Sequence, residues 1–170
     1  MINNLKESLW NQFGASITML ENAIEMCPNG SWDNNSKFWY NAYHCLFFLD
    51  YYLTMEPINF KPPPPFTLSE FEDILPPRVY EKNELLSYLN SSFDKCNKLI
   101  AGLTEATINE RWVNESGTMN YSVLEILLYN MRHVQHHAAQ LNFILRQTIN
   151  NAPDWVSRPK AALSSFANGK

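Results

Sequence analysis

The chain has 170 residues, 45% of them hydrophobic and 18% charged, which is ordinary for about one globular domain. Its net charge is −4 and it has no run rich in lysine or arginine, which argues against a nucleic-acid-binding protein. The N-terminus lacks the apolar core of a signal peptide, and no apolar stretch approaches the roughly 18 residues of a membrane span. Since the three cysteines form no CxxC pair or disulfide framework, we expect a cytoplasmic protein that binds no membrane and no nucleic acid.

The first part of the chain predicts two helices. Apolar residues recur at spacings of three and four from about Leu5 to Met26, and residues 27–30 (CPNG) end that pattern. A second helix is expected from about Lys37 to Met55, with Asn35 or Ser36 as its N-cap. This segment is apolar almost all round, which indicates burial on several sides.

A long connection follows, from Glu56 to Pro77. Its proline runs, at residues 62–65 and 76–77, favour extended backbone over helix or paired strand. A connection of this length inside a small domain often serves as a lid or a binding loop.

Two further helices are predicted. The third runs from about Tyr80 to Ala101, and a loop with Trp112 separates it from the fourth. The fourth spans about Ser122 to Ile149, and Ser122 with Glu125 fits a capping box. We therefore expect an all-α four-helix bundle over residues 1–150, with a C-terminal surface tail over residues 151–170.

The chain has four histidines, and three of them stand close together on the fourth helix. His133 and His137 lie about 40° apart on one helical face, because each residue turns by about 100°. That face also carries the apolar side chains, whereas His136 points about 60° the other way. His133 and His137 are thus expected to face inward together, with His136 retained as a less favoured substitute ligand.

Two inward imidazoles one turn apart can bind one metal ion, and His44 in the buried second helix is the remaining candidate ligand. Three neutral imidazoles leave coordination positions open, as in catalytic sites. The ion is expected to be divalent: zinc, nickel, iron or manganese. Asn41, Asn130 and Gln140 are candidates for orienting the rings, and the proline-rich and Trp112 loops for bordering the pocket.

At these residues the chain resembles the DinB/YfiT-like superfamily, to which metal-dependent enzymes belong. The resemblance is carried by FWYNAYHCLFFLDYYL around His44 and by RHVQHHAAQLNFILRQ around His133 and His137. It implies a four-helix bundle with up-down-down-up connectivity, a divalent ion held by these histidines, and a homodimer. Relatives of this kind include thiol transferases that use bacillithiol or mycothiol, a maleylpyruvate isomerase and a suspected hydrolase.

The leading hypothesis is a metal-dependent enzyme of the thiol transferase or hydrolase type. Its partner would be a small molecule, such as a low-molecular-weight thiol, and the ion would lower the pKa of a bound water or thiol. The alternative is a non-catalytic metal-binding protein of the stress-response type. A metal-free helical interaction module is a third hypothesis. No signature in the sequence selects a particular substrate.

Overall fold

The computed structural model describes residues 1–164 and is built mainly from helices. In chain order the elements are α1 (Ile2–Met26), α2 (Asn29–Trp32), α3 (Phe38–Tyr52), α4 (Ser69–Glu72), α5 (Lys82–Gly102), the 3-10 helix η1 (Thr107–Asn109), β1 (Arg111–Val113), β2 (Asn120–Ser122) and α6 (Val123–Ile149). The predicted all-α class is confirmed. Within residues 1–164, no helix has both the length and the apolar character needed to cross a membrane.

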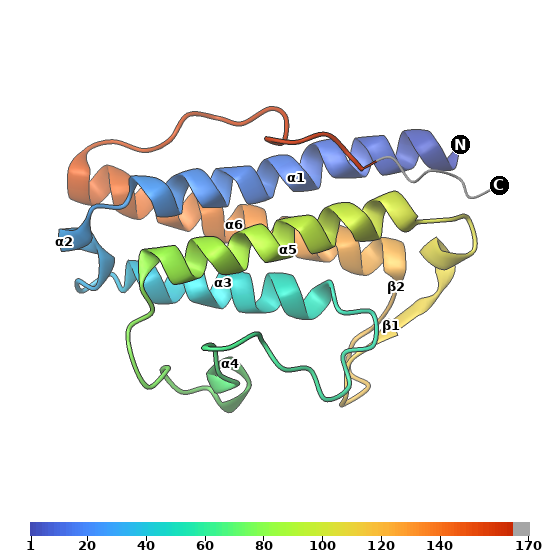
Figure 1. Ribbon diagram of the computed structural model, residues 1–170, viewed down its shortest axis with the longest axis horizontal. Helices are drawn as coiled ribbons and strands as arrows, with labels where there is room; N and C mark the ends of the chain where they lie inside the picture. Colours follow the sequence, from blue (N-terminus) through green and yellow to red (C-terminus); the bar gives the residue numbers. More distant parts are fainter. Residues whose placement is uncertain (165–170) are drawn as a thin grey trace.

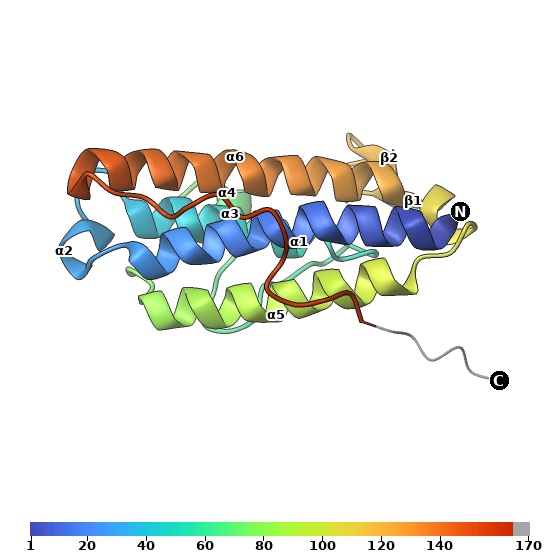
Figure 2. The same cartoon turned by 90° about the horizontal axis from the view of Figure 1, so that it is seen from above.

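The four long helices lie side by side (Figures 1 and 2). Both α1 and α3 pack against α5 and α6. In Figure 1, α3 and α5 run in one direction and α1 and α6 in the other. The connection between α3 and α5 therefore travels back along the outside of the helices, and α4 lies within it (Figure 1).

The apolar periodicity of α1 faces the interior as predicted. The residues expected on its core side are all 5% exposed or less: Leu9, Phe13, Ile17, Leu20 and Ile24. Helix α3 is buried over most of its circumference, as its composition predicts, and ends at Tyr52, a little before the predicted Met55. Because α3 contacts both α5 and α6, a nearly continuous apolar surface is what its position requires.

The two predicted helix starts have different outcomes. The prediction of an Asn35 or Ser36 cap is wrong, because α3 begins after Lys37, whose φ of 50° is left-handed, and no side chain caps the helix. The Asn34 side chain instead accepts a hydrogen bond from the backbone N–H of Ser36. At α6 the N-cap is Ser122, which accepts from the backbone N–H of Glu125 at 3.1 Å; this is one of the two hydrogen bonds of the predicted capping box.

A short antiparallel hairpin precedes α6 and was not predicted. Its strands, β1 and β2, have three residues each, too few to produce a recognisable alternation of polar and apolar residues. Trp112, at the centre of β1, is completely buried and donates from its indole N–H to the carbonyl oxygen of Thr54 at 2.8 Å. The hairpin is thereby attached to the C-terminal end of α3.

The segment after α6, as far as residue 164, crosses the surface of α1 and α5 (Figure 2). The Trp10 indole donates to the carbonyl oxygen of Ala161 at 3.0 Å, and the Asn97 amide donates to that of Ala162 at 2.9 Å. The Lys160 ammonium contacts Glu21 at 2.5 Å. This surface segment is held by side chains of both helices, and residues 165–170 lie outside the described part.

Gly14 is where this segment comes closest to α1. A Cβ atom added there would lie 2.7 Å from the Cβ of Pro159. Gly14→Ala should lower the free energy of unfolding by about 1 kcal/mol, since overpacking costs about 1–3 kcal/mol and the gain in helix propensity is about 1 kcal/mol. Urea unfolding measures the difference. Gly30→Ala is the control, because nothing lies within 4 Å of its added Cβ, and stabilisation by Gly14→Ala would contradict the close packing.

Candidate metal centre

One face of α3 is left open, and His44 lies on it. Eleven of the 15 residues of α3 are buried. The partly exposed ones include Tyr40, His44 and Phe48, which follow one another at a spacing of four and so share one helical face. The His44 side chain is 32% exposed. The partly exposed face of α3 therefore carries a histidine at its centre.

Helix α6 brings His133 and His137 to the same place. The ring centroids lie 4.4 Å apart for His133 and His137, 4.8 Å for His44 and His137, and 5.7 Å for His44 and His133. One ring nitrogen from each residue lies within 4.8 Å of those from the other two. Two nitrogens bound tetrahedrally to one zinc ion lie about 3.4 Å apart, given Zn–N bonds of about 2.0–2.1 Å. Ring movements of about 1–1.5 Å therefore separate the most distant pair of nitrogens from a shared coordination sphere.

Burial keeps the two α6 imidazoles neutral. Desolvation, with a smaller effect of the neighbouring histidines, lowers the pKa of His133 to about 3 and that of His137 to about 4. Both rings are therefore unprotonated at neutral pH, and this is the form that binds a metal ion. Each ring can contribute a lone pair without first losing a proton to solvent.

The hydrogen bonds around the cluster fit a metal ion. The Nδ1 atoms of His133 and His137 are buried and have no hydrogen-bond partner within residues 1–164. Burying a polar atom without a partner costs roughly 1–3 kcal/mol, a cost that coordination to a metal ion can offset. The Nδ1 atom of His44, by contrast, lies 2.5 Å from Oε2 of Glu70, which leaves its Nε2 atom for another ligand.

Sequence reasoning missed Glu70. The Asn41 amide donates to the carbonyl oxygens of Ser36 and Lys37, and the Asn130 amide donates to that of Leu49. Within residues 1–164, neither side chain makes a hydrogen bond to a histidine ring. Gln140 slightly opposes the lowering of the pKa of His137 but makes no hydrogen bond of normal geometry to that ring in the described chain. Glu70 lies 26 residues from His44 in a segment without periodicity, and no local pattern indicated it.

His136 lies outside the cluster, as its direction on the helix predicts. Its side chain is exposed, although its ring centroid is 5.1 Å from that of His137. Among the described residues, the group whose ligand atoms converge consists of His44, His133 and His137. His136 therefore serves as a control for experiments on the other α6 histidines.

Aromatic rings surround the cluster. The Phe48 ring lies 4.9 Å from that of His44, and the Tyr52 ring 5.9 Å from that of His133, measured between centroids. The two long loops contribute behind them: Phe71 next to Phe48 at 6.2 Å, and Trp112 next to Tyr52 at 5.8 Å. The histidines are therefore set in an apolar wall that is partly open to solvent.

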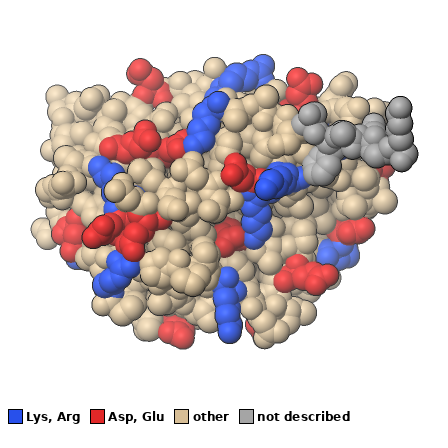
Figure 3. Space-filling model, in the orientation of Figure 1, with Lys and Arg blue, Asp and Glu red and all other residues tan. Residues whose placement is uncertain are grey.

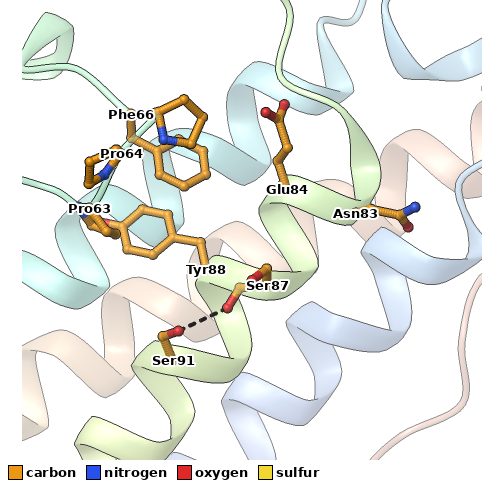
Figure 4. A pocket seen from close by; sticks show the side chains of 9 residues that line it. Pro63, Pro64, Phe66, Asn83, Glu84, Ser87, Tyr88 and Ser91 are labelled. Atoms are coloured by element: carbon orange, nitrogen blue, oxygen red, sulfur yellow. Dashed lines mark hydrogen bonds between the residues drawn. The ribbon is translucent and has the colours of Figure 1, made fainter.

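The proline run itself lines a different pocket. Pro63, Pro64 and Phe66 line a pocket of about 360 Å³ together with Tyr88 of α5, and the Phe66 ring stacks on that of Tyr88 at 4.5 Å between centroids (Figure 4). In the same pocket Ser91 donates to the carbonyl oxygen of Ser87. Within the α3–α5 connection it is α4, rather than the prolines, that reaches the histidines.

On the face shown in Figure 3, basic and acidic side chains are interspersed, and neither sign forms a continuous patch.

The chain is similar to a known protein family. Comparisons with curated proteins and with solved structures gave no match. A family model described as the DinB superfamily matches residues 16–141, well over half of the chain, and this range contains all three converging histidines. It also covers α3, α5, the C-terminal part of α1 and most of α6. The chain therefore belongs to the DinB superfamily.

Proposed function

We propose that this protein is a divalent-metal-dependent enzyme that acts on a small molecule, with His44, His133 and His137 as the metal ligands. The observation that carries the proposal is the convergence of ring nitrogens from two helices to within 4.8 Å of one another. We further propose that the four long helices form the up-down-down-up bundle of the family, and that the protein is a homodimer. Zinc, nickel, iron and manganese remain the candidate ions, because imidazole does not select among them.

An enzyme is favoured over a structural site because the cluster is incomplete and accessible. Three imidazoles leave at least one position of a four-coordinate ion free, and the His44 side chain is 32% exposed. A divalent ion supplies Lewis acidity, which brings the pKa of a water or thiol ligand close to neutrality. Phe48 and Tyr52 exclude water from one side of the cluster, so a small organic substrate, with a low-molecular-weight thiol as donor, suits these surroundings. We propose thiol transfer or hydrolysis as the reaction type.

The second candidate function is a non-catalytic metal-binding protein in which the ion ties α3 to α6. Two features favour it: the ligands come from both helices, and the buried Nδ1 atoms of His133 and His137 gain a partner if coordinated. The two functions differ in whether the ion retains an exchangeable position.

Cobalt substitution tests this difference. Elemental analysis of untagged protein should first give about one divalent ion per chain. The visible spectrum of the cobalt form should then change when a low-molecular-weight thiol is added, because the thiol enters the open position. A cobalt spectrum insensitive to thiols and to anionic inhibitors would support the non-catalytic site, and protein purified without metal would support the interaction module. A screen for thiol transfer and hydrolysis follows only in the first case.

A further inference from the structure

The inference concerns α4, the short helix in the connection between α3 and α5. Its position against α3 is set by contacts that do not involve the histidines. The Tyr43 hydroxyl donates to the carbonyl oxygen of Thr67 at 2.8 Å, and the Phe71 ring lies 4.9 Å from the rings of both Phe47 and Tyr51. Glu70, between these anchors, is thereby presented to the open face of α3.

The Glu70 carboxylate is buried with little compensation from the protein. Its side chain is 3% exposed, and within residues 1–164 the hydrogen-bonding partner of its Oε2 atom is His44. Its Oε1 atom is buried without a hydrogen-bond partner of normal geometry in that part of the chain. The nearby Tyr40 has a pKa raised first by burial and then by the charge of Glu70 and a side-chain hydrogen bond to it. Burying a carboxylate without a lysine or arginine partner is unfavourable, so a purely structural role does not explain it.

The contact with His44 has a definite chemical consequence. A carboxylate can only accept, so the hydrogen in the 2.5 Å contact belongs to Nδ1 of His44. The neutral ring then carries its lone pair on Nε2, the nitrogen on the other side of the ring. His133 and His137 have no comparable partner for Nδ1 within residues 1–164.

We propose that Glu70 is a positioning residue that fixes the tautomer and the orientation of His44 for metal binding. The pair would form the carboxylate–histidine–metal arrangement common at metal sites. The inference rests on the proposed metal site, and it means that the α3–α5 connection contributes a residue to that site. His44 is then oriented before the ion binds, and His133 and His137 complete the site when the ion binds.

The first test needs no metal. In ¹⁵N-resolved NMR of the metal-free protein, His44 should be protonated on Nδ1. Glu70→Ala should move the proton largely to Nε2, whereas Glu70→Gln should retain the wild-type signature because its amide oxygen still accepts a hydrogen bond. Glu72→Ala is the matched control, since Glu72 is exposed on the same helix. A His44 tautomer unchanged in Glu70→Ala would overturn the inference.

The second test measures zinc affinity by competition with a chelator. Glu70→Ala should bind zinc about 10–100-fold more weakly, as expected for loss of a partner behind a ligand. Glu70→Gln should recover most of the affinity, and Glu72→Ala should match wild type. Wild-type affinity in Glu70→Ala would refute the positioning role but leave the three-histidine site intact. If the wild-type protein binds none of zinc, nickel, iron and manganese, the proposed function fails, while the tautomer measurement still decides whether Glu70 orients His44.

Discussion

His137→Ala is expected to lower the affinity for zinc by more than about 100-fold and to give protein that is purified without stoichiometric metal. Losing a partner behind a ligand already costs about 10–100-fold, and here a ligand itself is removed. His137 has the ring closest to both of the others, at 4.4 Å from His133 and 4.8 Å from His44. Elemental analysis and chelator competition measure the loss.

His136→Ala is the matched control for this variant. The two residues are adjacent on α6, but the His136 side chain is exposed and lies outside the converging group. The His136→Ala variant should therefore retain the metal content of the wild-type protein. Equal loss of metal in both variants would show that His136 is a ligand, and unchanged metal in His137→Ala would refute the proposed site.

In His137→Ala, the thermal stability should no longer depend on whether metal is present. A ligand that binds only the folded state stabilises it by about 4 kcal/mol at a free concentration of 1,000 Kd. Adding a chelator should therefore lower the Tm of the wild-type protein but leave that of His137→Ala unchanged. In the absence of metal, His137→Ala should lose no stability through a lost hydrogen bond, because Nδ1 of His137 is buried without a partner within residues 1–164.

Trp112→Ala is expected to reduce the free energy of unfolding by about 3–5 kcal/mol, the usual cost of truncating a fully buried large aromatic side chain. The residue is completely buried, its ring lies 5.4 Å from that of Tyr51, and its indole donates to the carbonyl oxygen of Thr54. Such a loss is a large part of the 5–15 kcal/mol that stabilises a typical domain. Urea denaturation followed by circular dichroism measures it.

Trp155→Ala is the control, since Trp155 is 74% exposed and should change stability by no more than about 0.5 kcal/mol. Trp112→Phe separates packing from hydrogen bonding: it keeps most of the ring but leaves the Thr54 carbonyl without its donor, at a cost of about 1–3 kcal/mol. If Trp112→Ala proved as mild as Trp155→Ala, the hairpin would not be attached to α3 as the structure shows.

The long helices were predictable because their signals are local. An apolar stripe at spacings of three and four requires only neighbouring residues, and the observed bounds of α1 and α6 lie within a few residues of the predictions. The ends were less predictable: Lys37, which precedes α3, has a left-handed conformation that no side-chain capping pattern indicates. The hairpin around Trp112 was missed because three-residue strands carry no measurable period.

The histidine pair of α6 was also predictable, since helical geometry alone places His133 and His137 on one face. That His44 joins them, and that Glu70 stands behind His44, depends on the packing of α3 against α6 and of α4 against α3. These contacts join segments that are 89 and 26 residues apart, counted from His44 to His133 and to Glu70. Helical periodicity persists for only a few turns, so it can orient side chains within one helix, whereas bringing side chains from different segments to one point requires the folded core.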